Sequence, residues 1–160
     1  MLTQDKAGMI KRRRQWLQSA LAVAAVAVCA PAQAVRRRPL VEVWKSPTCG
    51  CCGGWIEHMQ AAGFEVRAHD VGNTAARARA GLPASLGSCH TALVGGYVVE
   101  GHVPAEDVRR LLAERPVAIG LAVPGMPIGS PGMEQDNRRD PYDVLLVTAD
   151  GSTTVWRAYR

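Results

Sequence analysis

Three cysteines crowd into the run Cys49-Gly50-Cys51-Cys52, which follows a short apolar segment and precedes a stretch with helical spacing. Thiolates at the start of a helix are stabilised by unpaired backbone N–H groups and by the positive end of the helix dipole. They suit two kinds of chemistry, thiol–disulfide exchange and the binding of soft metal ions.

The spacing within this run allows both kinds of chemistry. Cys49 and Cys52 form an ordinary C-x-x-C pair, the arrangement of a redox disulfide. Cys51 and Cys52 are neighbours in a first helical turn and point about 100° apart, so they are poorly placed to chelate one ion as a pair. They can instead bridge several metal ions in a thiolate cluster.

The elements around the cysteines are predicted from hydrophobic periodicity. Residues 39–45 and 64–71 alternate as strands, and residues 51–62 between them show helical spacing. This β-α-β order favours a parallel pair of strands. Further along, the sequence predicts a short helix over 75–80, a hairpin of 91–94 and 97–100, and a helix over 103–114 with Pro104 in its first turn.

The predicted order of elements is that of an α/β protein with a thioredoxin-like fold and a mixed central sheet. Residues 115–140 are rich in Gly and Pro, and a connection of that length in a compact domain is usually functional or disordered. The segments 143–148 and 153–159, joined by Asp150-Gly151, predict a C-terminal β-hairpin. We expect one domain over residues 35–160.

A thioredoxin-like fold brings a fourth thiol to the first three. Its loop entering the hairpin packs against the start of the cysteine-bearing helix and normally carries a cis-proline; here that loop holds Cys89 and His90. Four soft thiolates beside an imidazole suit Cu(I), with zinc and iron–sulfur clusters as competitors. We therefore predict Cys49, Cys51, Cys52 and Cys89 as metal ligands, with the Cys49–Cys52 redox disulfide as the alternative.

Other side chains are weaker candidates. Met126 and Met133 in the long loop offer thioether sulfurs that can join His90 beside the ligands, although packing the loop onto the core is the simpler role. His102 precedes a predicted helix, where we expect it to act as a cap.

Residues 1–34 have the features of a cleavable export signal. A basic segment at residues 11–14 is followed by an uncharged stretch over 17–30 and by Ala32-Gln33-Ala34, a typical cleavage site. The apolar stretch of about 14 residues is short for a membrane span, so no stable anchor is expected. The Arg13-Arg14 pair also resembles a twin-arginine signal, and the export route stays open between it and the general one.

Export changes how charge and cysteine content are interpreted. The chain carries a net charge of +5, of which four charges belong to residues 1–34. The nearly neutral remainder has no basic stripe, so nucleic-acid binding is not expected. Cys29 leaves with the signal, and four cysteines remain in the exported protein.

Taken together, these blocks resemble the CopG-like family of periplasmic copper-resistance proteins. The resemblance covers residues 41–159 and rests on residues 45–52, Trp55 with His58-Met59, residues 88–91, residues 100–105 and residues 120–127. It implies a multinuclear copper cluster held by Cys49, Cys51, Cys52 and Cys89, a periplasmic location, and contact with copper ions and other periplasmic copper-handling proteins. An oxidoreductase that interconverts Cu(I) and Cu(II) is implied as an activity, but turnover stays open.

Two other functions remain open at this point. A thiol–disulfide oxidoreductase would use Cys49 and Cys52, although Cys89-His90 in place of the usual cis-proline should impair binding of an extended peptide. A copper chaperone would pass its metal to a partner without any change in oxidation state.

Overall fold

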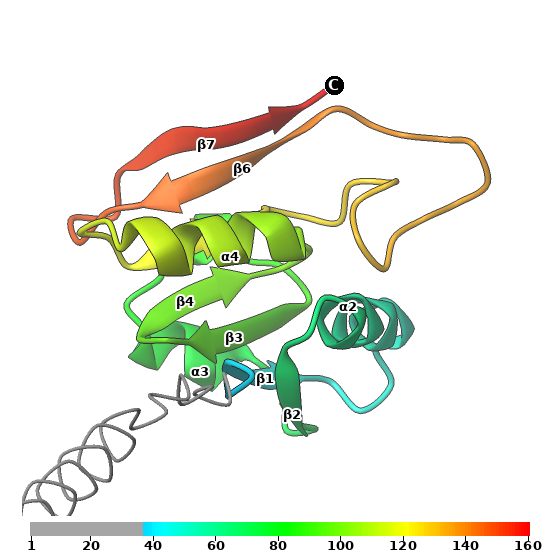
Figure 1. The fold of residues 1–160 in the computed structure, drawn as a ribbon, viewed down its shortest axis with the longest axis horizontal. Helices are drawn as coiled ribbons and strands as arrows, with labels where there is room; N and C mark the ends of the chain where they lie inside the picture. Colours follow the sequence, from blue (N-terminus) through cyan, green and yellow to red (C-terminus); the bar gives the residue numbers. More distant parts are fainter. Residues whose placement is uncertain (1–36) are drawn as a thin grey trace, which may run out of the picture. The chain divides into compact units, whose positions relative to one another are not determined.

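A mixed β-sheet forms the centre of the protein in the computed structural model, which describes residues 37–160 (Figure 1). The seven strands of this part lie in the order β2-β1-β3-β4-β5-β6-β7. The predicted signal peptide, its cleavage site and Cys29 lie outside the described residues. The strands are β1 (Leu40–Lys45), β2 (Glu65–His69), β3 (His90–Val94), β4 (Tyr97–Glu100), β5 (Gly120–Ala122), β6 (Tyr142–Val147) and β7 (Thr153–Tyr159); the helices are α2 (Gly50–Ala61), α3 (Thr74–Arg79), α4 (Ala105–Glu114) and a short 3₁₀ turn at Ala84–Leu86.

The strand pairings confirm the predicted α/β class. Strands β1 and β2 are parallel neighbours connected by α2, as the β-α-β order predicts. Strands β3 and β4 form the predicted antiparallel hairpin, whose turn residues Gly95 and Gly96 have φ values of 56° and 90°. Glycine adopts this left-handed backbone without steric cost. The arrangement is compatible with a thioredoxin-like fold.

Helices α2 and α4 cover one face of the sheet and build the core there. Alternate residues of β1, Val41 and Val43, are fully buried against apolar side chains of these helices, among them Trp55, Met59 and Leu111. The period of two along the strand therefore decides which side chains enter this core.

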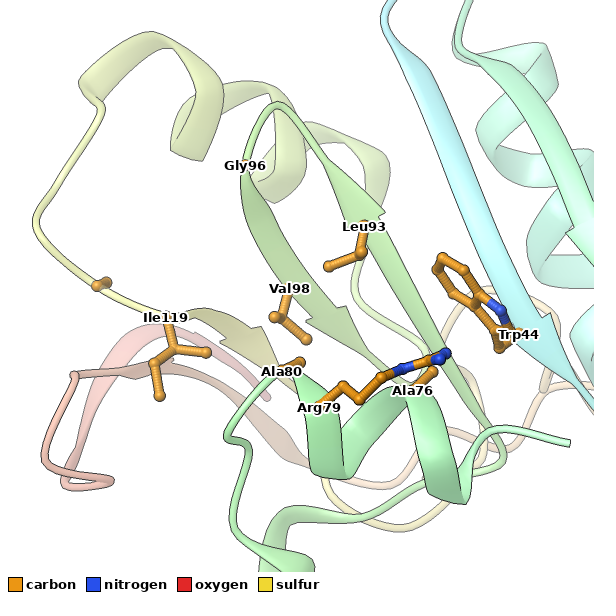
Figure 2. Close-up of a pocket in the computed structure, with 9 residues that line it drawn as sticks. Trp44, Ala76, Arg79, Ala80, Leu93, Gly96, Val98 and Ile119 are labelled. Atoms are coloured by element: carbon orange, nitrogen blue, oxygen red, sulfur yellow. The ribbon is translucent and has the colours of Figure 1, made fainter.

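Among the described α-helices, the short helix α3 lies on the opposite face. Between α3 and strands β3 and β4 lies a cavity of about 550 Å³, with Trp44, Leu93 and Arg79 among its lining residues (Figure 2). No cysteine or histidine lines this cavity, so it lies apart from the residues predicted to bind metal.

One strand and one helix boundary differ from the predictions. Strand β5, parallel to β4, lies inside the segment predicted to be a long connection; three residues are too few to show a pattern. A Cβ atom at Gly120 would lie 1.8 Å from the Val98 carbonyl oxygen, so glycine permits this pairing. Helix α4 begins at Ala105, with Pro104 as its N-cap instead of in its first turn.

The C-terminal hairpin of β6 and β7 is confirmed and extends the sheet beyond β5 (Figure 1). It is fastened to α4 by the Tyr159 hydroxyl, which donates to Asp107 Oδ2 at 2.6 Å. Between residues 37 and 160, no helix has the length and apolar character needed to cross a membrane.

Candidate metal centre

The first turn of α2 presents the three clustered cysteines. A tight turn closes before the helix, where the Cys49 backbone N–H donates to the Ser46 carbonyl at 3.1 Å. Cys49 is the N-cap, and the helix starts at Gly50. As a result Cys49 and Cys51 are half-buried, whereas Cys52 is buried in the core.

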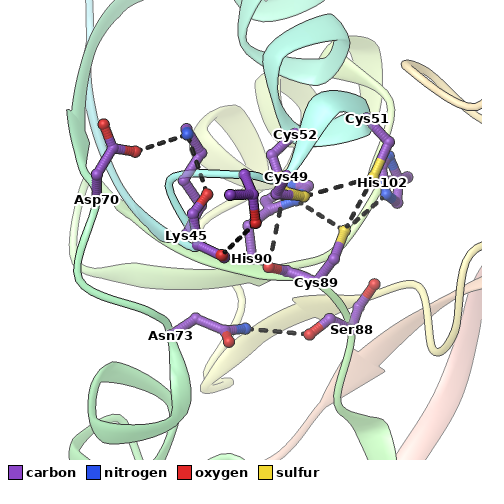
Figure 3. Close-up of a disulfide and its surroundings, with 12 residues drawn as sticks. Lys45, Cys49, Cys51, Cys52, Asp70, Asn73, Ser88, Cys89, His90 and His102 are labelled. Atoms are coloured by element: carbon purple, nitrogen blue, oxygen red, sulfur yellow. Dashed lines mark hydrogen bonds and ion pairs between the residues drawn. A yellow bond between two sulfur atoms is a disulfide. The ribbon is translucent and has the colours of Figure 1, made fainter.

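The structure brings the fourth predicted cysteine to the other three (Figure 3). The sulfur atoms of Cys49, Cys51, Cys52 and Cys89, here called the sulfur group, all lie within 4.8 Å of one another. Cys51 Sγ lies 3.5 Å from Cys49 Sγ and 3.7 Å from Cys89 Sγ. Two segments separated by 37 residues thus supply a single compact set of soft donors.

Two members of the sulfur group are joined to each other. Cys49 and Cys52 form a disulfide, and Cys51 and Cys89 are free thiols. In this state the site offers two thiols; reduction of the disulfide makes all four sulfurs available as thiolates.

His102 is a further member of the site that was not predicted. Its imidazole is fully buried, and Nε2 lies 3.0 Å from Cys89 Sγ. Nδ1 lies 2.8 Å from the Pro131 carbonyl oxygen, which can only accept, so Nδ1 carries the proton. Nε2 therefore turns an unprotonated lone pair toward Cys89, the form that binds metals. The predicted capping role is wrong, because the N–H of Ala105 at the start of α4 donates to His58 Nε2, whereas the ring nitrogens of His102 meet Cys89 Sγ and the Pro131 carbonyl oxygen.

His90 lies beside the sulfur group, as predicted. Its ring is fully buried against Trp55, with 4.4 Å between ring centroids, and its Nδ1 lies 3.5 Å from Cys89 Sγ. Burial, and then the neighbouring His102, lower the pKa of His90 to about 3. Its Nε2 is one of the buried polar atoms of residues 37–160 without a hydrogen-bond partner. Cys89, His90 and His102 thus form a second group of potential ligands that shares Cys89 with the first.

The Cys89 thiol is protonated in this state. Burial, followed by the adjacent Cys51, raises the pKa of Cys89 to about 12. The thiol can donate to His102 Nε2, which the tautomer of that histidine leaves as an acceptor. A metal ion binding here must displace this proton, since the thiolate is the ligand.

The long loop after β5 closes over the start of α2. Gly132 packs so tightly there that a Cβ atom would lie 2.5 Å from the Trp55 backbone nitrogen and 2.6 Å from the Cys51 carbonyl oxygen. The preceding residue, Pro131, holds His102. The loop is therefore part of the site, in agreement with one of the two predictions for this long connection, that it is functional.

The loop methionines are less closely involved. Met126 is 54% exposed, and Met133, next to Gly132, is half-buried. Within the described part of the chain, neither sulfur forms a hydrogen bond to the sulfur group. A ligand role for either methionine stays a prediction.

This chain is similar to a protein family and to two solved structures. Residues 86–133 match a family model described as "Protein of unknown function, DUF411", and this span includes Cys89, His102 and Gly132. A solved structure titled "Copper resistance protein copG- Form 2" is 44% identical, with a TM-score of 0.73 over 77% of this chain and 99% of that one. The corresponding "Form 1" is 46% identical, with a TM-score of 0.71 over 75% and 96%. A comparison with curated proteins gives no match.

Proposed function

Because this chain belongs to the CopG family of copper-resistance proteins, we propose that it binds copper through the sulfur group, with His102 as an additional ligand. The observation that carries this proposal is the approach of four cysteine sulfurs, from two segments, to within 4.8 Å of one another. A buried structural disulfide needs only two of them.

The donor set fits copper by its chemistry. Thiolates are soft ligands that favour Cu(I), and imidazole nitrogen is also a good copper ligand. Cys51 Sγ is close to the sulfurs of both Cys49 and Cys89, so as a thiolate it can be shared between two ions. We therefore propose a multinuclear copper–thiolate cluster, with His90, Met126 and Met133 next to the ligands.

The Cys49–Cys52 pair links this site to a change in copper oxidation state. Oxidation of two thiols to a disulfide releases two electrons and two protons. Two Cu(II) ions accept those electrons and become Cu(I), while Cys51, Cys89 and His102 remain as ligands. We propose this conversion, with copper as the substrate, as the redox step of the site; it takes place once for each reduced Cys49–Cys52 pair, and the two protons pass to solvent.

The cellular setting follows from the predicted export signal. We propose that residues 1–34 are removed and that the domain over 35–160 acts in the periplasm. Its partners there would be copper ions and other copper-handling proteins.

Metal analysis tests the binding proposal. Protein purified from copper-supplemented cells should contain more than one copper per chain, and Cys51→Ser should lower this ratio. Stoichiometric zinc or the absence of metal would contradict the proposal. Because two sulfurs are oxidised in the disulfide state, copper loading of metal-free protein should also rise after treatment with a reductant.

An anaerobic titration tests the redox step separately. Reduced, metal-free protein should convert two Cu(II) to Cu(I) for each Cys49–Cys52 disulfide formed, as measured with a Cu(I)-specific chelator and by thiol counting. Cys52→Ser should abolish the conversion. Unchanged thiol content after Cu(II) is consumed would exclude this route.

The disulfide itself favours a second candidate, a thiol–disulfide oxidoreductase that acts on other thiols. In that case metal-free protein should reduce a disulfide substrate with good turnover, and Cys52→Ser should abolish it. Cys51→Ser separates the two functions, because Cys51 is surplus to a disulfide mechanism but central to the sulfur group.

A further inference from the structure

Three polar side chains form hydrogen bonds to the backbone of the loop that carries Cys89. The backbone N–H of Ser88 donates to Glu100 Oε1 at 2.7 Å, and its carbonyl oxygen accepts from Arg77 Nη2 at 2.7 Å and Asn73 Nδ2 at 3.0 Å. Both peptide groups of Ser88 are therefore held by side chains from other elements. We call Asn73, Arg77 and Glu100 the Ser88 clamp.

The clamp is itself tied together. Arg77 Nε donates to Glu100 Oε1 at 2.8 Å, and Thr91 Oγ1 donates to Glu100 Oε2 at 2.6 Å. Glu100 is fully buried, whereas the Arg77 side chain is 16% exposed. A buried carboxylate is costly unless it is paired and hydrogen-bonded, and here both conditions are met.

The clamp lies on the face of the sheet opposite to the sulfurs. Glu100 and Thr91 belong to the strand positions that face α3; Asn73 is the N-cap of α3 and Arg77 lies in its last turn. In Figure 3 the Asn73–Ser88 contact lies on the other side of the Cys89 backbone from the Cys49 and Cys51 sulfurs. None of the three clamp side chains belongs to either group of potential ligands.

Its position explains how one sulfur can be held at the correct distance from three others. Cys49, Cys51 and Cys52 share the start of α2, but Cys89 belongs to a different segment, and its Sγ lies 3.7 Å from Cys51 Sγ. Ser88 is held on one side of Cys89, and on the other side the Gly101 N–H donates to the His90 carbonyl at 3.0 Å.

We propose that Arg77, Glu100 and Asn73 are positioning residues that fix the Cys89 thiol beside Cys51, so that copper meets a site already arranged for it. This inference rests on the proposed copper binding. It assigns a role to a buried ion pair that does not touch the metal ligands directly. Pre-organised ligands bind more tightly because less order must be imposed on binding.

A double-mutant cycle tests whether the clamp acts through Cys89. Arg77→Met should weaken Cu(I) affinity about tenfold, the lower end of the loss seen when support for a ligand is removed. In a Cys89→Ser background the same change should have little further effect, because the sulfur it positions is gone. An equal loss in both backgrounds, or no loss in either, would overturn the inference.

The matched control is Arg79→Met. Arg79 lies on the same helix two residues later, is exposed, and forms no ion pair within residues 37–160. It should leave Cu(I) affinity unchanged. If Arg77→Met does not fold, Asn73→Ala removes only the contacts to the Ser88 carbonyl and Thr91 and should show the same dependence on Cys89 with a smaller loss.

Amide hydrogen exchange of metal-free protein separates failure of the clamp from failure of copper binding. The Ser88 N–H should exchange at least tenfold faster in Arg77→Met than in wild type. The exchange rates of core amides, such as that of Val43, should change no more in Arg77→Met than they do in Arg79→Met. Unchanged Ser88 exchange would overturn the clamp even if copper binds. Wild-type protein that binds no copper would defeat the proposed function and leave this measurement valid.

Discussion

The proton on His102 determines what this residue can contribute. The Pro131 carbonyl oxygen accepts a hydrogen bond from Nδ1 and so keeps Nε2 unprotonated, 3.0 Å from Cys89 Sγ. Burial also lowers the pKa of His102, which favours the neutral ring that metals require. A backbone carbonyl thus prepares a side chain for a ligand role without touching the metal site.

Replacement of His102 should therefore weaken copper binding. We expect His102→Gln to lower copper affinity by about tenfold or more, in the range found when support for a metal ligand is lost. The measurement is competition with a copper chelator. His69→Gln is the control, because His69 stacks on Trp44 and lies outside both groups of potential ligands. Equal affinities for His102→Gln and His69→Gln would remove His102 from the site.

The depressed pKa of His90 should make metal-free protein sensitive to acid. The unfolded chain binds a proton at His90 below about pH 6.5, whereas the folded protein does so only near its pKa of about 3. Stability therefore falls as the pH drops from about 6.5 toward 3. At pH 5 the loss from this group is about 2 kcal/mol relative to pH 7.5.

Urea denaturation at the two pH values measures this effect. His90→Phe removes the titrating group and should lose about 2 kcal/mol less than wild type between pH 7.5 and pH 5. His58 and His102 also have lowered pKa values and retain a share of the acid sensitivity. The same loss in wild type and His90→Phe would show that His90 is not held neutral by burial.

At the scale of elements, the site is a meeting of four segments. The start of α2 supplies three cysteines, the loop before β3 supplies Cys89, and the segment between β4 and α4 supplies His102. The loop after β5 supports His102 through Pro131, and it meets the start of α2 where the backbone of Gly132 packs against that of Cys51 and Trp55. No side chain larger than hydrogen fits between them.

A pair of glycine substitutions tests this contact. Gly132 and Gly125 both have positive φ values, 82° and 71°, but only Gly132 meets other atoms where a Cβ would lie. Gly125→Ala should lower the free energy of unfolding by about 1–2 kcal/mol, because alanine disfavours the left-handed backbone at this position. Gly132→Ala should lower the free energy of unfolding further, because its Cβ would meet the backbone of Trp55 and Cys51. It should also weaken copper binding, because the shift of the loop displaces Pro131 from His102. Equal losses of stability in a thermal melt, with unchanged copper affinity, would contradict a closed loop.

At the scale of the whole molecule, the predicted export signal determines the redox environment in which the cysteine site would act. Disulfides persist more readily outside the reducing cytosol, and the observed Cys49–Cys52 disulfide suits an exported protein. Removal of residues 1–34 would also remove Cys29 and four of the five net positive charges. The proposed mature protein would be nearly neutral.

Processing can be measured directly on the expressed full-length chain. We expect the periplasmic fraction to contain a protein that begins near Val35, as determined by intact mass and N-terminal sequencing. Ala34→Phe should block cleavage, because small residues are required at that site. Replacing Arg13 and Arg14 by lysine should stop export if the twin-arginine route is used and leave it unchanged otherwise. A full-length chain in the periplasm of the wild type would contradict the predicted cleavage.

Much of this molecule could be predicted because its signals are local. Strand β1 alternates, helix α2 follows the cysteine turn, and Gly95-Gly96 marks a hairpin, each within a few residues. Strand β5 could not be predicted, because three residues show no period and its pairing with β4 depends on the close approach of Gly120 to Val98.

The same distinction applies to the site. By itself, the sequence determined that Cys49, Cys51 and Cys52 share a helix start, and the order of elements indicated that Cys89 faces them. Only the tertiary structure showed that His102 turns Nε2 to Cys89, because its orienting partner Pro131 lies 29 residues away. Likewise, only the fold brings Arg77 and Glu100 together behind Ser88. Residue types and short spacings are written in the chain, whereas the tautomer of a histidine and the anchoring of a loop depend on neighbours that folding alone supplies.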